Sequence, residues 1–414
     1  MGERKRSILV PQYIEGFKCI GSACEDSCCV GWRVDIDNET YRKYQKVKDD
    51  ELVGLFERYI NRNRAVGHND YSYAKIKLLP DLRCPFLDSD SLCKIHLKRG
   101  AEYLSNVCAT YPRLTNVVNG TLERAATMSC PEVARLALLN PNQMEFDEME
   151  ESYNTRNIIK TDLNTRDLKF NNKFQKYFWE LRIFIISLVQ NRRFRLSERL
   201  IILGMFFKKL QEYLDEERID DIPVLIGAYV NHLETDVFDE NINEIPVQYN
   251  IQMELLKELA DRRFSLGISS KRYIECFTQF ITGINYKLED TMEQNGERYR
   301  FAWENYYEPY MKEHEYILEN YIVNYIFSTL FPISDEKNIF DTYMVMILHY
   351  ALIKMMLIGM SEFHKGLTDE LVIKLIQSFV KTIEHNQQFI QDITEVLKRN
   401  DYNSMTYMAI LIKN

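Results

Sequence analysis

From about residue 155 onward, apolar positions recur with the three-to-four-residue spacing of amphipathic helices. Thr368 is a typical N-cap residue, and Asp369 and Glu370 follow it in the first turn. Ser197 is a second N-cap candidate. Beside the helices that begin at these caps, the pattern predicts helices over 163–193, 248–265, 270–293, 314–331 and 340–360. We therefore expect an all-helical bundle over residues 155–414.

The N-terminal part of the chain, as far as Asn140, shows a different pattern. Strand-like alternation is short, as over residues 31–36, and prolines and glycines interrupt the chain throughout. An acidic stretch over 145–151 follows, which we interpret as a linker. The predicted fold class is mainly α, with a loop-rich, cysteine-rich, metal-binding domain over residues 1–140 and a helical domain over 155–414.

Charge and hydropathy exclude two classes of partner. The net charge of −9 lacks the basic excess that non-specific nucleic-acid binding requires. The apolar run over 344–360 contains His349 and Lys354 and is shorter than the roughly 20 residues of a membrane span, so we interpret it as a buried helix. The basic N-terminus is followed by too few apolar residues for a secretion signal. We expect a cytoplasmic protein that binds neither nucleic acid nor a membrane.

Most of the cysteines lie in the N-terminal part of the chain. They are Cys19, Cys24, Cys28, Cys29, Cys84, Cys93, Cys108 and Cys130. Because disulfides are rare in the cytoplasm, this clustering predicts metal or redox chemistry, and all eight are candidate metal ligands. Cys276 stands alone in a predicted helix and is expected to be an ordinary core thiol.

The spacing of these cysteines leaves the metal open between zinc and iron. Thiolates bind both zinc and iron–sulfur clusters. The Cys-x2-Cys hooks of short zinc sites are absent, and the cysteines of iron–sulfur proteins have more variable spacing. His96, three residues after Cys93, is a further candidate ligand. We expect the thiolates of residues 19–29 and 84–130 to meet at one locus, as one site with spare thiols or as two sites.

Four segments carry a family resemblance. They are VPQYIEGFKC at 10–19 with CEDSCCVGW at 24–32, ERAATMSCPEVA at 123–134, ENYIVNY at 319–325 and EHN at 384–386. In these segments the chain resembles the flagellin lysine-N-methylase family. The cysteine domain alone also resembles small zinc- or iron-chelating proteins with a Cys-x2-Cys-x2-Cys-Cys pattern, although the first spacings here are longer. Glycine-rich nucleotide loops and the common hydrolase motifs are absent from the sequence.

The resemblance implies a protein lysine N-methyltransferase that acts on flagellin. It implies S-adenosylmethionine as methyl donor and a [4Fe-4S] cluster held by cysteines, with zinc as the alternative metal. The alternative function is a non-catalytic zinc- or iron-binding module that recognises flagellin or another protein partner. The sequence assigns no catalytic base, and it leaves the target lysines and the oligomeric state open.

Overall fold

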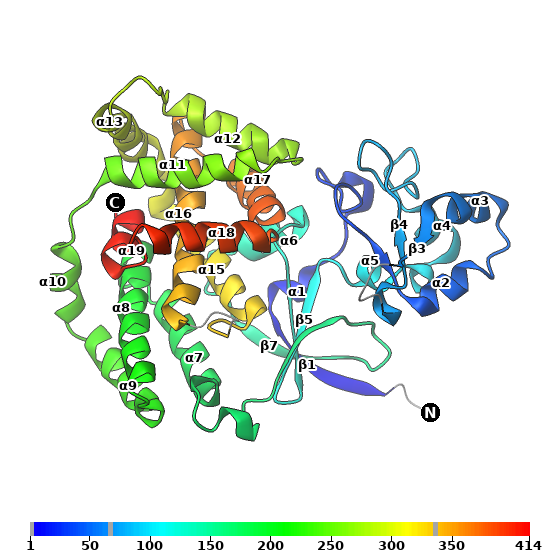
Figure 1. Cartoon of the computed structure of the whole chain (residues 1–414), viewed down its shortest axis with the longest axis horizontal. Helices are drawn as coiled ribbons and strands as arrows, with labels where there is room; N and C mark the ends of the chain where they lie inside the picture. Colours follow the sequence, from blue (N-terminus) through cyan, green and yellow to red (C-terminus); the bar gives the residue numbers. More distant parts are fainter. Residues whose placement is uncertain (1–3, 65–68, 334–337) are drawn as a thin grey trace. The chain divides into compact units, whose positions relative to one another are not determined.

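A computed structural model describes residues 4–64, 69–333 and 338–414, and the chain divides into two compact units (Figure 1). The N-terminal unit comprises Met1–Val133 and Phe146–Asp162. The helical unit comprises Ala134–Glu145 and Leu163–Asn414. Residues 134–145 therefore belong to the helical unit, and the chain then returns to the N-terminal unit before the long helices begin.

A mixed five-stranded sheet organises one part of the N-terminal unit. Its strand order is β7-β1-β6-β5-β8. The strands are β1 (Lys5–Pro11), β5 (Arg113–Val118), β6 (Thr121–Ala126), β7 (Phe146–Ser152) and β8 (Ile159–Leu163). Strand β1 pairs in parallel with β6 and antiparallel with β7, and β5 pairs antiparallel with β6.

The acidic stretch expected to be a linker forms strand β7. Its carboxylates face basic residues of β1: Lys5 Nζ lies 2.9 Å from Glu150 Oε2, and Arg6 lies 2.9 Å from Glu151 Oε1. Arg124 of β6 lies 2.7 Å from the other Glu151 oxygen. Opposite charges on neighbouring strands stabilise the pairing of an otherwise polar edge strand.

The rest of the N-terminal unit contains the cysteines and a small three-stranded sheet. The sheet has the order β2-β4-β3, formed by Asp35–Ile36, Ala74–Ile76 and Ile60–Arg62. Short helices surround it: α2 (Asn38–Tyr44), α3 (Asp50–Tyr59), α4 (Lys94–Arg99) and α5 (Asn106–Thr110), whereas α1 (Tyr13–Gly16) directly follows β1 beside the five-stranded sheet. Ile36, Leu52 and Phe86 are fully or almost fully buried in its core. The strand predicted over 31–36 is thus confined to its last two residues.

The helical unit is built around one long apolar helix, α16. Its helices are α6 (Pro131–Leu138, which begins just before the unit boundary), α7 (Phe178–Val189), α8 (Leu196–Asp215), α9 (Ile222–Leu233), α10 (Val237–Asn243), α11 (Tyr249–Ser265), α12 (Lys271–Gly283), α13 (Met292–Ala302), α14 (Glu308–His314), α15 (Tyr316–Thr329), α16 (Ile339–His364), α17 (Asp369–Phe379), α18 (Gln387–Arg399) and α19 (Met405–Ile412). Helices α8, α12, α17 and α19 all pack on α16 (Figure 1). Two π-helical segments, η7 (Trp303–Tyr307) and η8 (Val380–Glu384), interrupt this pattern.

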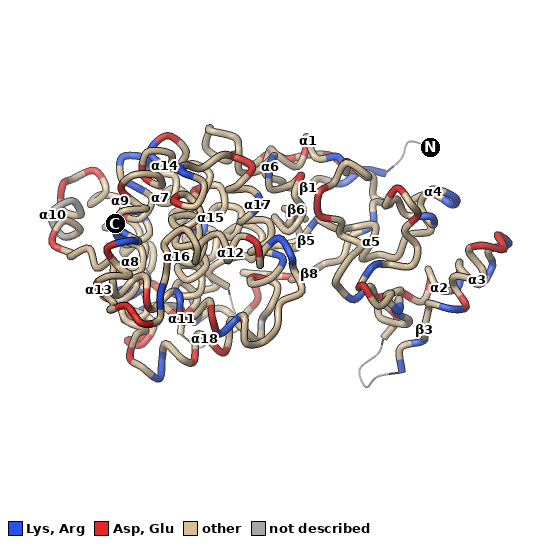
Figure 2. Tube along the Cα trace, turned by 90° about the horizontal axis from the view of Figure 1, so that it is seen from above, with Lys and Arg blue, Asp and Glu red and all other residues tan. Residues whose placement is uncertain are grey.

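The structure confirms the mainly α fold class and corrects three helix predictions. The first is the N-cap at Ser197, because α8 begins at Leu196 and its N-cap residue is Arg195. The helix expected over 163–193 covers only Phe178–Val189, because strand β8 and two short 3-10 turns occupy the preceding residues. The helix expected over 270–293 ends at Gly283. Helix α16 is long and apolar enough to cross a membrane, but 94% of its apolar window is buried, so it is the core helix that the sequence predicted. Along the Cα trace of each unit, Lys and Arg residues are interspersed with Asp and Glu residues (Figure 2).

Candidate functional site

The first group of cysteines lies on an irregular loop. Cys24 follows the 3-10 turn Gly21–Ala23, and its Sγ donates to the Asp26 carbonyl at 3.4 Å. The Cys28 carbonyl accepts a hydrogen bond from Trp32 Nε1, and the Trp32 ring packs edge-on against Tyr111 with centroids 4.9 Å apart. The loop is therefore fixed by backbone and aromatic contacts, which leave the Cys28 thiol exposed.

Backbone pairing joins this loop to the second group. The Cys84 amide donates to the Cys29 carbonyl at 2.9 Å, and Gly31 donates to Leu82 at 3.0 Å. Cys93 pairs with Leu87 in an isolated bridge and is the N-cap residue of α4. Segments that are far apart in the sequence are thus neighbours, as the prediction of a common locus requires.

The cysteine thiols affect one another's ionisation. Burial raises the pKa of the Cys84 thiol to about 12, and partial burial raises that of Cys130 to about 11. A charged Cys28 would raise the pKa of five other thiols, which are those of Cys24, Cys84, Cys93, Cys108 and Cys130. Cys28 is therefore the common neighbour of the cysteine region. Because like charges at short range disfavour ionisation, several thiolates can coexist here only beside a compensating cation.

The chemistry of these donors fits a soft metal or an iron–sulfur cluster. Thiolates are the usual ligands of both, and a bound cation would offset their mutual repulsion. Within the described ranges, however, no three His, Cys, Asp or Glu side chains are close enough to hold a metal ion. Cys19 is exposed and Cys276 is buried in α12 of the helical unit. The ligand set of eight cysteines, with His96 as a further candidate, remains a prediction.

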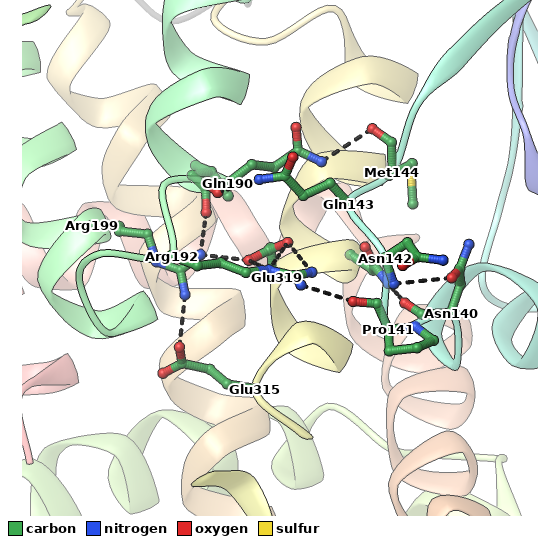
Figure 3. Close-up of polar contacts among 12 residues, drawn as sticks. Asn140, Pro141, Asn142, Gln143, Met144, Gln190, Arg192, Arg199, Glu315 and Glu319 are labelled. Carbon is green, nitrogen blue, oxygen red and sulfur yellow. Dashed lines mark hydrogen bonds and ion pairs between the residues drawn. The ribbon is translucent and has the colours of Figure 1, made fainter. Parts of the chain in front are cut away.

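A buried ion network is the main polar feature of the helical unit (Figure 3). The Glu319 carboxylate of α15 has no exposed surface. Arg192 Nη2 donates to Glu319 Oε1 at 2.9 Å, and Arg199 Nη1 donates to Glu319 Oε2 at 2.5 Å. Arg199 Nη2 also donates to Glu315 at 2.7 Å. Two arginines thus neutralise one fully buried carboxylate.

The same network holds residues 134–145 in the helical unit. Arg192 Nη1 donates to the Pro141 carbonyl at 2.8 Å, and Asn320 Nδ2 donates to the Asn140 carbonyl at 2.8 Å (Figure 3). Gln143 Nε2 donates to the Gln190 carbonyl at 2.7 Å. These bonds explain why the segment that follows α6 belongs to the helical unit.

The residues of the ENYIVNY segment are therefore largely buried, whereas in the EHN segment Glu384 is half-buried and His385 is exposed. Glu319 and Asn320 make the contacts just described, and Tyr321 donates to Glu384 Oε2 at 3.1 Å. Tyr325 packs against His349 with ring centroids 5.5 Å apart. In the helical unit, the ENYIVNY segment thus contributes Glu319, Asn320 and Tyr321 to a polar core.

Sequence reasoning missed the partners of Glu319 and the environment of Lys354. Helix α16 is apolar except at a few positions, and Lys354 is 5% exposed there. Its presence inside an apolar run was the available signal, since a lysine is almost never buried without a reason. Arg192 and Arg199 gave no such signal, because the stretch 192–199 contains four arginines and the two do not stand out in it.

Comparison with known proteins defines the class. Residues 182–411, more than half of the chain, match the family model described as "FliB lysine N-methylase C-terminal domain". Two curated proteins named "Lysine-N-methylase", from Salmonella choleraesuis (strain SC-B67) and Salmonella typhimurium (strain LT2), are each 23% identical over 97% of this chain and 98% of their own length. The "Flagellar biosynthetic protein FliU" of Salmonella muenchen is 31% identical over 37% of this chain and 89% of its own. No solved structure matches.

The protein is thus of the lysine N-methylase class. The chain belongs to the FliB lysine N-methylase family, as the resemblance of its sequence motifs implied.

Proposed function

We propose that this protein transfers methyl groups from S-adenosylmethionine to lysine side chains of flagellin in the cytoplasm. The observation that carries the proposal is similarity to two named lysine N-methylases along nearly the full length of both chains. The flagellar name of a third relative favours a flagellar substrate. The absence of a glycine-rich nucleotide loop from the sequence sets this protein apart from Rossmann-type methyltransferases.

The reaction sets one requirement for the protein. A lysine ammonium, with a pKa of about 10.4, must lose a proton before its nitrogen can attack a methyl carbon. The new N–C bond forms as the S–C bond breaks, and the bonding pair stays on sulfur. A site that lowers the pKa of the target lysine, by desolvation or a neighbouring cation, would serve this step.

We further propose that the N-terminal cysteines hold a [4Fe-4S] cluster. Cys28 and the thiols around it are the residues that would bind the cluster. When bound, the cluster would supply the positive charge that lets these thiolates coexist.

The test combines activity with metal analysis. Protein purified without oxygen is incubated with flagellin and isotopically labelled S-adenosylmethionine, and methylated lysines are located by mass spectrometry. We expect labelled lysines and a brown protein that contains iron. A colourless zinc protein that binds flagellin without methylating it would contradict the proposal and support the alternative of a non-catalytic recognition module.

A further inference from the structure

A cavity in the helical unit has a buried lysine in its wall. The cavity measures about 100 Å³, and its lining includes Lys354 and Tyr350 of α16, Trp303 and Tyr307 of η7, and the carboxylates Glu308 and Glu315. All of these residues lie within the range matched by the family model, 182–411. A space of this size accommodates a small charged group with its neighbouring carbon.

Lys354 is incompletely paired. Its Nζ donates one hydrogen bond, to the Ile412 carbonyl at the end of α19, at 2.9 Å. Among the described residues no carboxylate lies within ion-pair distance of it. An ammonium group has three N–H donors, so Lys354 has donors left for a ligand. Burial lowers the pKa of Lys354 to about 7, and the nearby Glu315 and Glu308 carboxylates only partly oppose this.

Both glutamate carboxylates of the lining are already paired with arginines. Glu308 pairs with Arg195 at 2.8 Å. Glu315 pairs with Arg199 at 2.7 Å. The unmatched charge of the wall is therefore positive, and an anionic group is the ligand that would compensate it.

The carboxylates that pair with arginines still have capacity. The arginine contacts use Oε1 of Glu308 and Oε2 of Glu315, and the second oxygen of each accepts no hydrogen bond from the described residues. A carboxylate oxygen with a free lone pair accepts readily from an ammonium group. The cavity thus presents the Lys354 amine, which has donors left for a ligand, and two acceptor oxygens that accept no hydrogen bond from the described residues.

The aromatic wall is built on an irregular helix. Trp303 and Tyr307 belong to the π-helical segment η7, which lies between α13 and α14. Such segments are rare and occur frequently at functional sites, because the wider turn redirects side chains. Here the wider turn is the part of the chain that supplies two rings to the cavity.

We propose that this cavity binds the α-amino and α-carboxylate groups of an amino-acid-type ligand, with the carboxylate on Lys354 and the amino group near Glu308 and Glu315. Under the proposed function, on which this identification rests, the ligand of that class is S-adenosylmethionine. A free amino acid such as methionine presents the same two groups, so the test must separate the two sources.

Binding is measured by calorimetry on the full-length protein with S-adenosylmethionine, with its decarboxylated analogue and with L-methionine. Lys354→Met keeps an unbranched side chain that is one atom shorter, and it removes the charge. We expect it to weaken binding of S-adenosylmethionine about tenfold or more. The wild type should lose a similar factor with the decarboxylated analogue, whereas Lys354→Met should no longer distinguish the two compounds.

Lys257→Met is the matched control. Lys257 is also a largely buried lysine of the helical unit, but it is paired with Asp261 on α11 and lies outside the cavity. Its replacement should leave affinity unchanged. If Lys354→Met does not fold, Lys312→Met tests the same idea, because Lys312 is an exposed cation of the lining with no ion pair to the described residues, and its loss should weaken binding severalfold.

The outcomes separate the site from the function. If Lys354→Met and Lys312→Met both bind S-adenosylmethionine with wild-type affinity, the proposed site is wrong, even if the enzyme methylates flagellin. Lys354-dependent binding of L-methionine but not of S-adenosylmethionine would support the site and contradict the donor. No binding of either compound would overturn the site, and methylation would then be judged by mass spectrometry alone.

Discussion

His349 places a titratable ring in the core without a hydrogen bond. Neither ring nitrogen has a partner in the described part of the chain, and the rings of Tyr325 and Phe379 pack edge-on at 5.5 and 5.8 Å. Burial lowers the pKa of His349 from 6.5 to about 4. The His349 ring is therefore protonated below about pH 6.5 in the unfolded chain but only below about pH 4 in the folded chain. Because the unfolded chain binds more protons between these pH values, the free energy of unfolding falls as the pH falls through this window.

His349→Phe should remove this acid sensitivity. The loss between pH 6.5 and 4 in the wild type is on the order of 3 kcal/mol, from roughly 1.4 kcal/mol per pKa unit. Urea unfolding followed by circular dichroism at pH 7 and pH 5 covers about 1.5 units of this window, so about 2 kcal/mol of the loss should be measured there. His232→Phe, at an exposed position of α9, is the control and should keep the wild-type slope. An unchanged slope in His349→Phe would assign the acid sensitivity to other groups.

Glu319 is a second buried residue whose replacement should lower the free energy of unfolding. Glu319→Gln removes the charge that neutralises Arg192 and Arg199, and Arg199 is only 1% exposed. Arg199 keeps its pair with Glu315, so the expected cost is the loss of charge-assisted hydrogen bonds, about 1.5–3 kcal/mol of unfolding free energy. Glu212→Gln breaks the exposed pair with Lys209 and should cost about 0–1 kcal/mol. Denaturant titration compares the two, and equal losses would show that the network contributes no more than a surface pair.

At the scale of elements, α12 and α16 approach closely at glycines. A Cβ on Gly359 would lie 2.5 Å from the Phe280 carbonyl oxygen, and one on Gly283 would collide with the Gly359 backbone. Gly359→Ala should therefore destabilise the helical unit by about 1–3 kcal/mol through overpacking. Gly227→Ala in α9 meets open space and should be neutral or stabilising by up to about 1 kcal/mol. Thermal unfolding of both variants checks the contrast, and a stable Gly359→Ala would mean that the two helices can separate at little cost.

Local patterns predicted helices better than they predicted strands. Helix α11 was predicted over 248–265 and is Tyr249–Ser265, and Thr368 caps α17 by accepting from the Leu371 amide. Both rest on signals within one segment. Strand β7 depends on β1, which lies at the other end of the N-terminal unit's sequence, and its acidic side chains look like a linker until Lys5 and Arg6 are placed opposite them. Because β7 pairs with a strand that is distant in the sequence, its own residues show no local periodicity from which the strand could be predicted.

At the scale of the whole molecule, the two units differ in what the sequence reveals of their chemistry. The sequence predicts metal chemistry for the cysteine region, because thiols cluster in the part of the chain between Cys19 and Cys130, and that chemistry stays a prediction. The Lys354 cavity was not, since α8, α14, α15, α16 and η7 each contribute to its lining and no two of these contributions form a motif. A site assembled by tertiary packing shows in sequence only as single polar residues in apolar runs.

The division into two units makes the role of the cysteines testable in the intact chain. Cys28 is the common neighbour of five thiols, and the helical unit buries its own core around α16. Under the proposed function, Cys28→Ser should lower iron content and lysine methylation together. The thermal transition of the helical unit should stay in place, because amphipathic helices that bury their own apolar faces need no metal.

Cys276→Ser should give the opposite pair of results: the helical unit is destabilised and the iron content is kept. Its thiol is buried in α12, so a hydroxyl there should destabilise the helical unit by about 1–3 kcal/mol while iron content stays at the wild-type level. Iron analysis, methylation of flagellin and calorimetric unfolding are measured on both variants. Full iron content and full activity in Cys28→Ser would exclude Cys28 as an essential ligand. Loss of iron with retained methylation would instead show that the metal stabilises the N-terminal unit and takes no part in the reaction.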